Sequence, residues 1–283
     1  MQFADPKNDI AFKKIFGDKN HKNILISFLN SILDFKNEKI IVDVELANPY
    51  QVPRIPDLKE TILDINATNK NGETFIVEMQ KKDLGDFTKR SLYYTSKAYI
   101  SQLPKGQDYS RLKKVYFIGI LNFNIFENKN FISRHLIVNQ ETDTQDIKDF
   151  EFNFIELPKF KKELKELNTL LDKWVYFLKY ASNLTMIPKE YESIPAFQEA
   201  FSIATQNTWN TKELEVYEYV AMKEFDELNA LKTAEKKGLE KGMEKGERKA
   251  KLEIAKNLLD ILDDETISLK IGLSVEDICK LRK

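Results

Sequence analysis

The chain has 283 residues, of which 42% are hydrophobic and 31% charged, with a formal net charge of −1. This length allows a core domain with an appendage, and the balanced charge removes overall basicity as an argument for nucleic-acid binding without excluding it, because only the contacting face must be positive. A single cysteine, Cys279, excludes an internal disulfide, and the only histidines, His21 and His135, form no cluster with zinc-like spacing.

Nothing in the sequence indicates a membrane role. The start, MQFADPKNDIAF, lacks the basic and apolar blocks of a signal peptide. The longest apolar run, VYFIGIL, is far too short to cross a bilayer. We therefore expect a cytoplasmic protein.

The first predicted element is an amphipathic helix. Asn8 or Asp9 can cap it, and it continues through AFKKIFGD and HKNILISFLNSILDF, with Gly17 as a break between two pieces. The segment IIVDVELA follows as a strand, and a loop containing Pro53 and Pro56 comes after it.

The next two extended segments predict a hairpin with polar side chains in an unusual place. ETILDINATNKNGE carries Asp64 in its middle, and FIVEMQKK carries Glu78 and Gln80. Because side chains alternate along a strand, Glu78 and Gln80 share a face with Ile76, while Phe75, Val77 and Met79 line the other face. Two polar groups therefore stand where a buried face is expected.

The register of this hairpin decides whether the carboxylates meet. A three-residue loop, 70–72, closed by Gly72 in the left-handed conformation, pairs Asp64 directly with Glu78. A two-residue Asn71-Gly72 loop would shift the pairing by one and put the carboxylates on opposite faces. In the first register the two Cβ atoms would lie ~4.5–5.5 Å apart, close enough to bind one hard divalent cation.

The rest of the first half alternates a helix with strands. DFTKRSLYYTSKAYISQL has a helical period, KKVYFIGILNF is the near-continuous apolar pattern of a strand covered on both faces, and ISRHLIVN and FEFNFIEL are predicted edge strands. After Pro158 the pattern becomes helical, in KFKKELKELNTLLDKWVYFLKYA, AFQEAFSIAT and ELEVYEYVAMKEFDELNALKTAEKKG. We predict three parts: residues 1–158, a helical extension at 159–230, and a terminal part at 231–283.

The terminal part contains the repeat KKGLEKGMEKGERKAK, in which Gly238, Gly242 and Gly246 recur every four residues. Each glycine costs an exposed helix roughly 1 kcal/mol relative to alanine, so the repeat is either a loose charged tether or a contact face. Near the end, Gly272 closes one short helix and Ser274 caps the next. We expect the C-terminal helices to mediate homo-oligomerisation or partner binding, with the two short terminal helices as a second interaction or DNA-contact module.

The order of helix, three strands, helix and strand resembles the PD-(D/E)XK nuclease fold, and more narrowly the group of Rpn (recombination-promoting) nucleases and PD-(D/E)XK nuclease family transposases. The segments that carry the likeness are DIAFKKIFG, DLKETILDINA with its Asn-Gly turn, IVEMQ, and TKRSLYYTSKAYISQLPKGQDYSRLKKVYFIGILNF. This resemblance implies an α/β restriction-endonuclease-like fold, a mixed central sheet flanked by helices, followed by a helical C-terminal region.

The resemblance also implies an activity, which is cleavage of DNA with little sequence preference and with a divalent metal, Mg2+ by default and Mn2+ as a substitute. Asp64 and Glu78 match the two metal-binding acids of the motif. Gln80 stands where the wider superfamily has a lysine, a replacement usual in this subgroup; glutamine can hydrogen-bond the attacking water but brings no charge.

Four further residues are predicted to support the site. Asp9 matches the polar position of the first helix, although a plain helix cap explains it equally well. Asp57 and Lys59 could approach the phosphate, but a solvated turn also explains them. Arg90 could clamp a phosphate, with a structural ion pair as the alternative.

Three functions follow from the sequence. The first is a metal-dependent DNA endonuclease acting in mobile-element recombination or phage defence. The second is a DNA-binding or protein-binding module on an inactive nuclease domain, which would keep DNA binding without metal binding. The third gives the biological work to the helical half, as an oligomerisation or inhibitor-contact surface, which residues 160–283 alone would reveal by binding partners.

Overall fold

The computed structural model describes residues 2–48, 50, 51 and 61–282. The chain divides into two compact units, residues 1–220 and 221–283, and each is described here by itself.

The first unit begins with two helices, α1 (Asp9–Phe16) and α2 (Lys22–Leu33). Of the two candidate caps, Asn8 is the one used, because its side chain accepts hydrogen bonds from the backbone N–H groups of Ile10 and Ala11. Gly17 ends α1, which confirms the predicted break.

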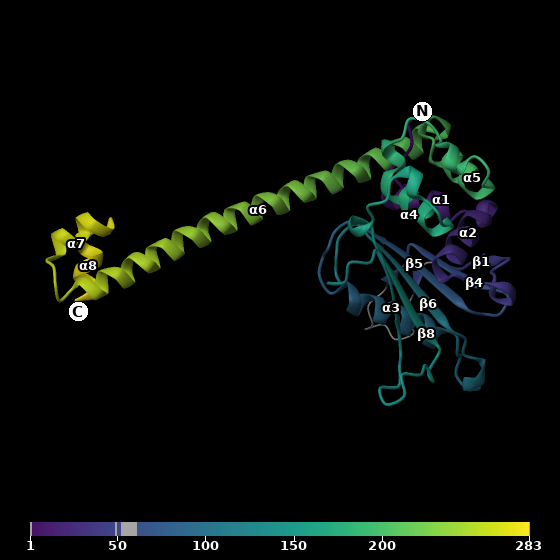
Figure 1. Cartoon of the computed structure of the whole chain (residues 1–283), viewed down its shortest axis with the longest axis horizontal. Helices are drawn as coiled ribbons and strands as arrows, with labels where there is room; N and C mark the ends of the chain where they lie inside the picture. Colours follow the sequence, from purple (N-terminus) through teal and green to yellow (C-terminus); the bar gives the residue numbers. More distant parts are fainter. Residues whose placement is uncertain (1, 49, 52–60, 283) are drawn as a thin grey trace. The chain divides into compact units, whose positions relative to one another are not determined.

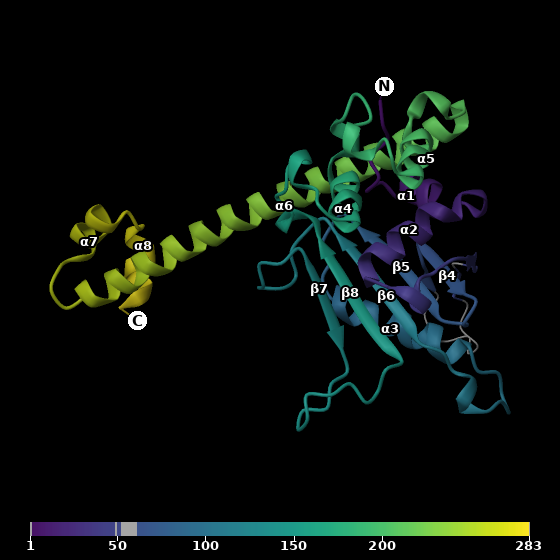
Figure 2. The same cartoon turned by 45° about the vertical axis from the view of Figure 1, so that its right-hand side comes forward.

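A mixed six-stranded sheet forms the centre of this unit, in the order β1-β4-β5-β6-β8-β7. Figure 2 shows β7, β8, β6, β5 and β4 side by side. The pairs β5–β6 and β6–β8 are parallel, and the pairs β1–β4, β4–β5 and β7–β8 are antiparallel. The strands are β1 (Val44–Leu46), β4 (Ile65–Asn69), β5 (Thr74–Gln80), β6 (Val115–Leu121), β7 (Ile132–Leu136) and β8 (Phe150–Glu156).

Two strand predictions need correction. The segment FEFNFIEL was expected at an edge, but β8 lies inside the sheet, between β6 and β7. Its polar residues are satisfied locally: Glu151, for example, pairs with Lys114 at 2.7 Å. The segment around Asp64 was expected as one strand, but it divides into β3 (Thr61–Ile62), which pairs with β2 (Tyr50–Gln51), and β4.

Helices cover both faces of the sheet, as predicted. Side chains of α1, α2, α4 (Leu170–Tyr180) and α5 (Pro195–Ala204) pack with Phe75, Val77 and Met79 in one large apolar core. These four helices lie together in Figure 1. On the other face, α3 (Phe87–Ser101) packs against Ile76 and the outward side of β6.

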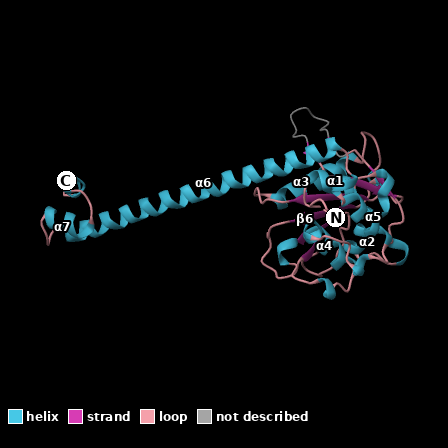
Figure 3. Ribbon diagram, turned by 90° about the horizontal axis from the view of Figure 1, so that it is seen from above, coloured by secondary structure: helices cyan, strands magenta, loops and turns pink. Residues whose placement is uncertain are grey.

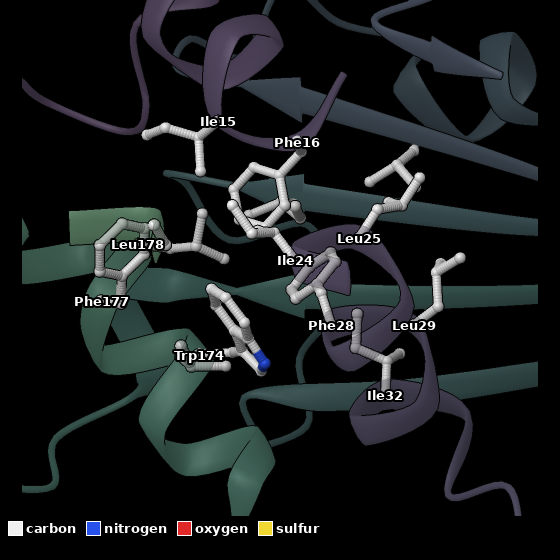
Figure 4. Packing of buried hydrophobic residues seen from close by; sticks show 14 of the residues in the cluster. Ile15, Phe16, Ile24, Leu25, Phe28, Leu29, Ile32, Trp174, Phe177 and Leu178 are labelled. Atoms are coloured by element: carbon white, nitrogen blue, oxygen red, sulfur yellow. The ribbon is translucent and has the colours of Figure 1, made fainter. Parts of the chain in front are cut away.

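Helices α4 and α5 are integral to the first core. Figure 4 shows Trp174 of α4 pointing toward Phe16 of α1 and Phe28 of α2. The indole of Trp174 lies 5.6 Å from the ring of Phe16 and 5.9 Å from that of Phe28, centroid to centroid. The sheet face behind the acids is therefore held by helices from both sides of Pro158.

The second unit contains most of α6 (Thr211–Leu258), then α7 (Asp264–Ile271) and α8 (Val275–Leu281). Figure 3 draws α6 as one continuous helix through the glycine repeat. Gly272 ends α7 with φ 71° and Ser274 caps α8, as predicted, and a small core of Ala255, Ile267 and Ile278 joins α7 and α8 to the end of α6. None of the described helices is both long and apolar enough to span a membrane.

The mixed sheet between helices, followed by a helical C-terminal region, confirms the predicted α/β class.

Candidate active site

The hairpin formed by β4 and β5 uses the three-residue loop. Gly72 has φ 80°, the left-handed conformation that glycine adopts without strain, and the backbone N–H of Asn69 donates to the carbonyl of Glu73 at 3.1 Å. Ile65 pairs with Val77 in this register. The next pair outward therefore places Asp64 opposite Glu78, on one face of the sheet.

The two carboxylates are locked together through the backbone. The N–H of Asp64 donates to Oε1 of Glu78 at 3.1 Å, and the N–H of Met79 donates to Oδ2 of Asp64 at 2.8 Å. The Asp64 carboxylate thus accepts a hydrogen bond from the backbone near the C-terminal end of β5. Asp64 itself lies in the break between β3 and β4, immediately before β4 begins.

Both acids are removed from solvent. The side chain of Asp64 is 14% exposed and Glu78 is 3% exposed. Burial, only partly offset by the Met79 N–H and by Lys13, raises the pKa of Asp64 to about 6. Burial and the neighbouring charge of Asp64 raise the pKa of Glu78 well above its usual range. The site therefore holds more negative charge than its described neighbours neutralise.

Gln80 and Arg90 form a chain that ends on Glu78. Nη2 of Arg90 donates to Oε1 of Gln80 at 3.3 Å, and Nε2 of Gln80 lies 3.5 Å from Oε2 of Glu78. The Arg90 guanidinium also lies over the ring of Phe87, 5.2 Å from its centroid, and its Nε is buried without a hydrogen-bond partner among the described residues. Arg90 thus fixes the orientation of the Gln80 amide.

Helix α1 contributes a residue that the sequence reasoning missed. Nζ of Lys13 lies 2.7 Å from Oδ1 of Asp9 and 3.4 Å from Oδ1 of Asp64. Burial alone would lower the pKa of Lys13, but the contacts with Asp9 and Asp64 raise it. The available signal was the four-residue spacing of Asp9 and Lys13, which places both on one face of a helix.

Residues 6–234 match the PD-(D/E)XK nuclease family transposase. The chain belongs to this family. A search of curated proteins and a search of solved structures find no match. Membership confirms the family suggested by the sequence and indicates a nuclease-like enzyme.

The structure places the other residues predicted for the site as follows. Asp57 and Lys59 lie outside the described residues. Asp9 is not the helix cap; it is the first residue of α1 and reaches the acids through Lys13. Tyr94 of α3 packs in the second apolar core, and burial together with the charge of Glu78 raises its pKa.

The donor set fits a hard divalent cation. Asp64 and Glu78 offer carboxylate oxygens, the ligands Mg2+ prefers, and burial raises the pKa of both groups, a cost that a bound cation would offset. Among the described residues no group of three or more His, Cys, Asp and Glu could hold a metal. Mg2+ typically takes one or two carboxylates together with waters and substrate phosphate.

A cavity adjoins Asp64, although Glu78 does not line it. A cavity of ≈ 260 Å³ is lined by Asp64 and Lys13 together with Leu46 and Asn66. A phosphate entering it would meet a carboxylate and an ammonium group at once.

Proposed function

We propose that this chain is a metal-dependent DNA endonuclease that hydrolyses phosphodiester bonds with little sequence preference. The observation that carries the proposal is the pair of facing, buried carboxylates, Asp64 and Glu78, whose pKa values are raised by burial and, for Glu78, also by the neighbouring charge of Asp64. A pair of strongly perturbed acids, one of which lines a cavity, is typical of functional sites, and family membership supports phosphodiester chemistry.

Asp64 and Glu78 would hold the cation, Mg2+ or Mn2+ in its place. The cation would supply positive charge at the scissile phosphate and lower the pKa of the attacking water. Gln80 has no charge to offer, but its amide is oriented by Arg90 and can hydrogen-bond and position that water.

The positive charge that a lysine at position 80 would have brought can come from elsewhere. Lys13 places an ammonium group 3.4 Å from Asp64, beside the cavity. We assign Lys13 the stabilisation of negative charge on the phosphate, and Asp9 the positioning of Lys13 through their 2.7 Å contact.

The wider role extends this proposal. The family supports mobile-element recombination, and the resemblance noted in the sequence supports phage defence as a second setting. We place the catalytic part at residues 1–158, supported by 159–230, and infer a cytoplasmic location. We also propose that copies of the chain associate through the C-terminal helices.

The test is cleavage of supercoiled plasmid at low salt by wild type, Asp64→Ala and Glu78→Ala, with Mg2+, Mn2+ or a chelator. Low salt matters because phosphate contacts weaken steeply with ionic strength. Glu45→Ala, an exposed acid on β1 of the same sheet, is the matched control. Cleavage by wild type and the control alone, abolished by chelator, supports the proposal. An inert wild type that still binds DNA would favour the inactive binding module instead.

A further inference from the structure

Helix α6 presents a long exposed surface. Every residue from Phe225 to Ala250 is exposed, including the three glycines of the repeat. At each of these glycines, a Cβ atom would meet nothing within 4 Å. A helix in water with three interior glycines, each costing roughly 1 kcal/mol, needs packing to be stable.

The exposed surface is amphipathic. Its large apolar side chains are spaced by three, three, eight and four residues, so at 3.6 residues per turn they fall within an arc of about 120°. They are Phe225 (62% exposed), Leu228 (38%), Leu231 (56%), Leu239 (65%) and Met243 (68%). We name these five residues the α6 stripe. A continuous exposed stripe of this kind marks an interaction surface.

Charge along α6 is segregated by sequence position. Residues 212–227 contain six acidic and two basic residues, a net charge of −4. Residues 232–251 contain eight basic and four acidic residues, a net charge of +4. Two copies side by side in parallel would set like charges together, whereas an antiparallel pair sets each acidic half against the partner's basic half.

We propose that α6 pairs with α6 of a second copy in antiparallel orientation, burying the α6 stripe about a twofold axis near Lys232. This inference rests on the self-association proposed above and does not depend on DNA cleavage. It specifies the partner as an identical chain, since the helix is complementary in charge to its own reverse and such a pair closes as a symmetric dimer.

The stripe itself selects the register. An axis at Lys232 sets Phe225 opposite Leu239, and Ala221 opposite Met243, so apolar residues face apolar residues at both ends. Lys232 and Glu235 are charged residues on the stripe side, and the same axis brings Lys232 of each copy within one turn of the other copy's Glu235. At the same helical spacing Gly242 and Gly246 fall within the arc of the stripe and Gly238 falls just outside it, so the glycines leave room for the two backbones to approach.

The first part of the test is the association state of the full chain. We expect sedimentation of wild type to give twice the mass of the 33.1 kDa chain, and Phe225→Glu to raise the dimer dissociation constant at least about tenfold, because a charge replaces a large buried side chain. A wild type that stays monomeric at all concentrations overturns both the self-association and this inference, while leaving the nuclease proposal intact.

The second part tests orientation with disulfides. In a Cys279→Ser background, Phe225→Cys and Leu239→Cys are oxidised separately and as a mixture, with Ala230→Cys, on the opposite side of α6, as the control. The antiparallel pair predicts cross-linking mainly in the mixture of Phe225→Cys with Leu239→Cys. Efficient cross-linking of each variant with itself, or a dimer that cross-links in no combination, overturns the antiparallel register.

Discussion

Two groups of buried acids in the first unit differ in how their charge is met. Glu156, 1% exposed at the end of β8, accepts hydrogen bonds from the backbone N–H groups of Ile125 and Phe126 and pairs with Lys159. Asp172, 2% exposed in α4, pairs with Lys162 at 2.7 Å; burial alone would raise its pKa, but Lys162 and Thr169 hold it below the usual value. These acids are structural.

The Asp64–Glu78 pair is the opposite case. Among the described residues no lysine or arginine forms an ion pair with Glu78. Nζ of Lys13 lies 3.4 Å from Asp64 and is closer to Asp9, at 2.7 Å. Burial therefore raises the pKa values of both acids. Burial of an acid therefore does not by itself mark a functional site, and it is the burial of Asp64 and Glu78 without a matching cation that supports our proposal.

The largest expected contrast is in catalysis. Glu78→Gln keeps the shape of the side chain but removes the charge that would hold the cation in the proposed site, so we expect plasmid cleavage to fall about 1000-fold or more. Glu156→Gln alters an acid that is buried equally deeply, and we expect its cleavage rate to stay within about threefold of wild type under conditions where it is folded. Equal losses in both variants would erase the distinction between the two groups.

The stabilities of the two variants should differ in the opposite sense, with Glu156→Gln the less stable one. Glu156→Gln leaves Lys159 buried without its counterion, which typically costs about 3–5 kcal/mol, so urea denaturation should move to lower concentration. Glu78→Gln removes a charge whose burial is uncompensated, so in chelator it should raise the melting temperature. A melting temperature for Glu78→Gln well below wild type would mean that the Glu78 carboxylate stabilises the fold.

The pH dependence of stability tests the raised pKa of Asp64. A carboxyl group whose pKa is higher in the folded chain binds its proton more tightly there than in the unfolded chain. The protonated Asp64 therefore contributes its full stabilisation to the metal-free protein below about pH 3.8, and this contribution is lost as the pH rises through about 6. Asp64→Asn has no such titration. At pH 8 in chelator we expect the variant to be more stable by about 1–3 kcal/mol, with the difference vanishing near pH 4. A constant difference across this range, measured by urea unfolding, would exclude the raised pKa.

Lys13 should give the smallest effect. Lys13→Gln removes one ammonium group near the phosphate while leaving both acids in place, so we expect the turnover rate to fall about tenfold to a hundredfold with DNA binding in Ca2+ nearly unchanged. Lys13→Arg should recover part of the rate. Lys89→Gln, an exposed lysine paired with Asp86, serves as the control. A Lys13→Gln variant as fast as wild type would remove Lys13 from the proposed chemistry.

The local parts of the site could be predicted from the sequence because local rules determine them. The turn chemistry of Gly72 sets the register that brings Asp64 opposite Glu78, and strand alternation puts both on the face of Ile76. The register remained one of two alternatives, since the Asn-Gly pair suits a two-residue loop as well.

The long-range parts could not be predicted. Contact between Lys13 and Asp64 joins residues 51 positions apart, and nothing in the period of the first helix specifies which strand it faces. β8 lies inside the sheet only because β7 pairs with its outer side, whereas the alternating polar residues of β8 are typical of an edge strand. The packing of α4 into the core of α1 and α2 likewise depends on tertiary contacts, such as Trp174 with Phe28.

The most direct test is a titration of Mn2+ into metal-free protein, with free Mn2+ followed by electron paramagnetic resonance. It compares wild type, Glu78→Gln and the control Glu156→Gln. Our assignment predicts one tight Mn2+ per chain in wild type and in the control, and loss of that binding in Glu78→Gln. Binding of Mn2+ by Glu78→Gln as tightly as by wild type, or no binding by wild type, would contradict a metal site at Asp64 and Glu78.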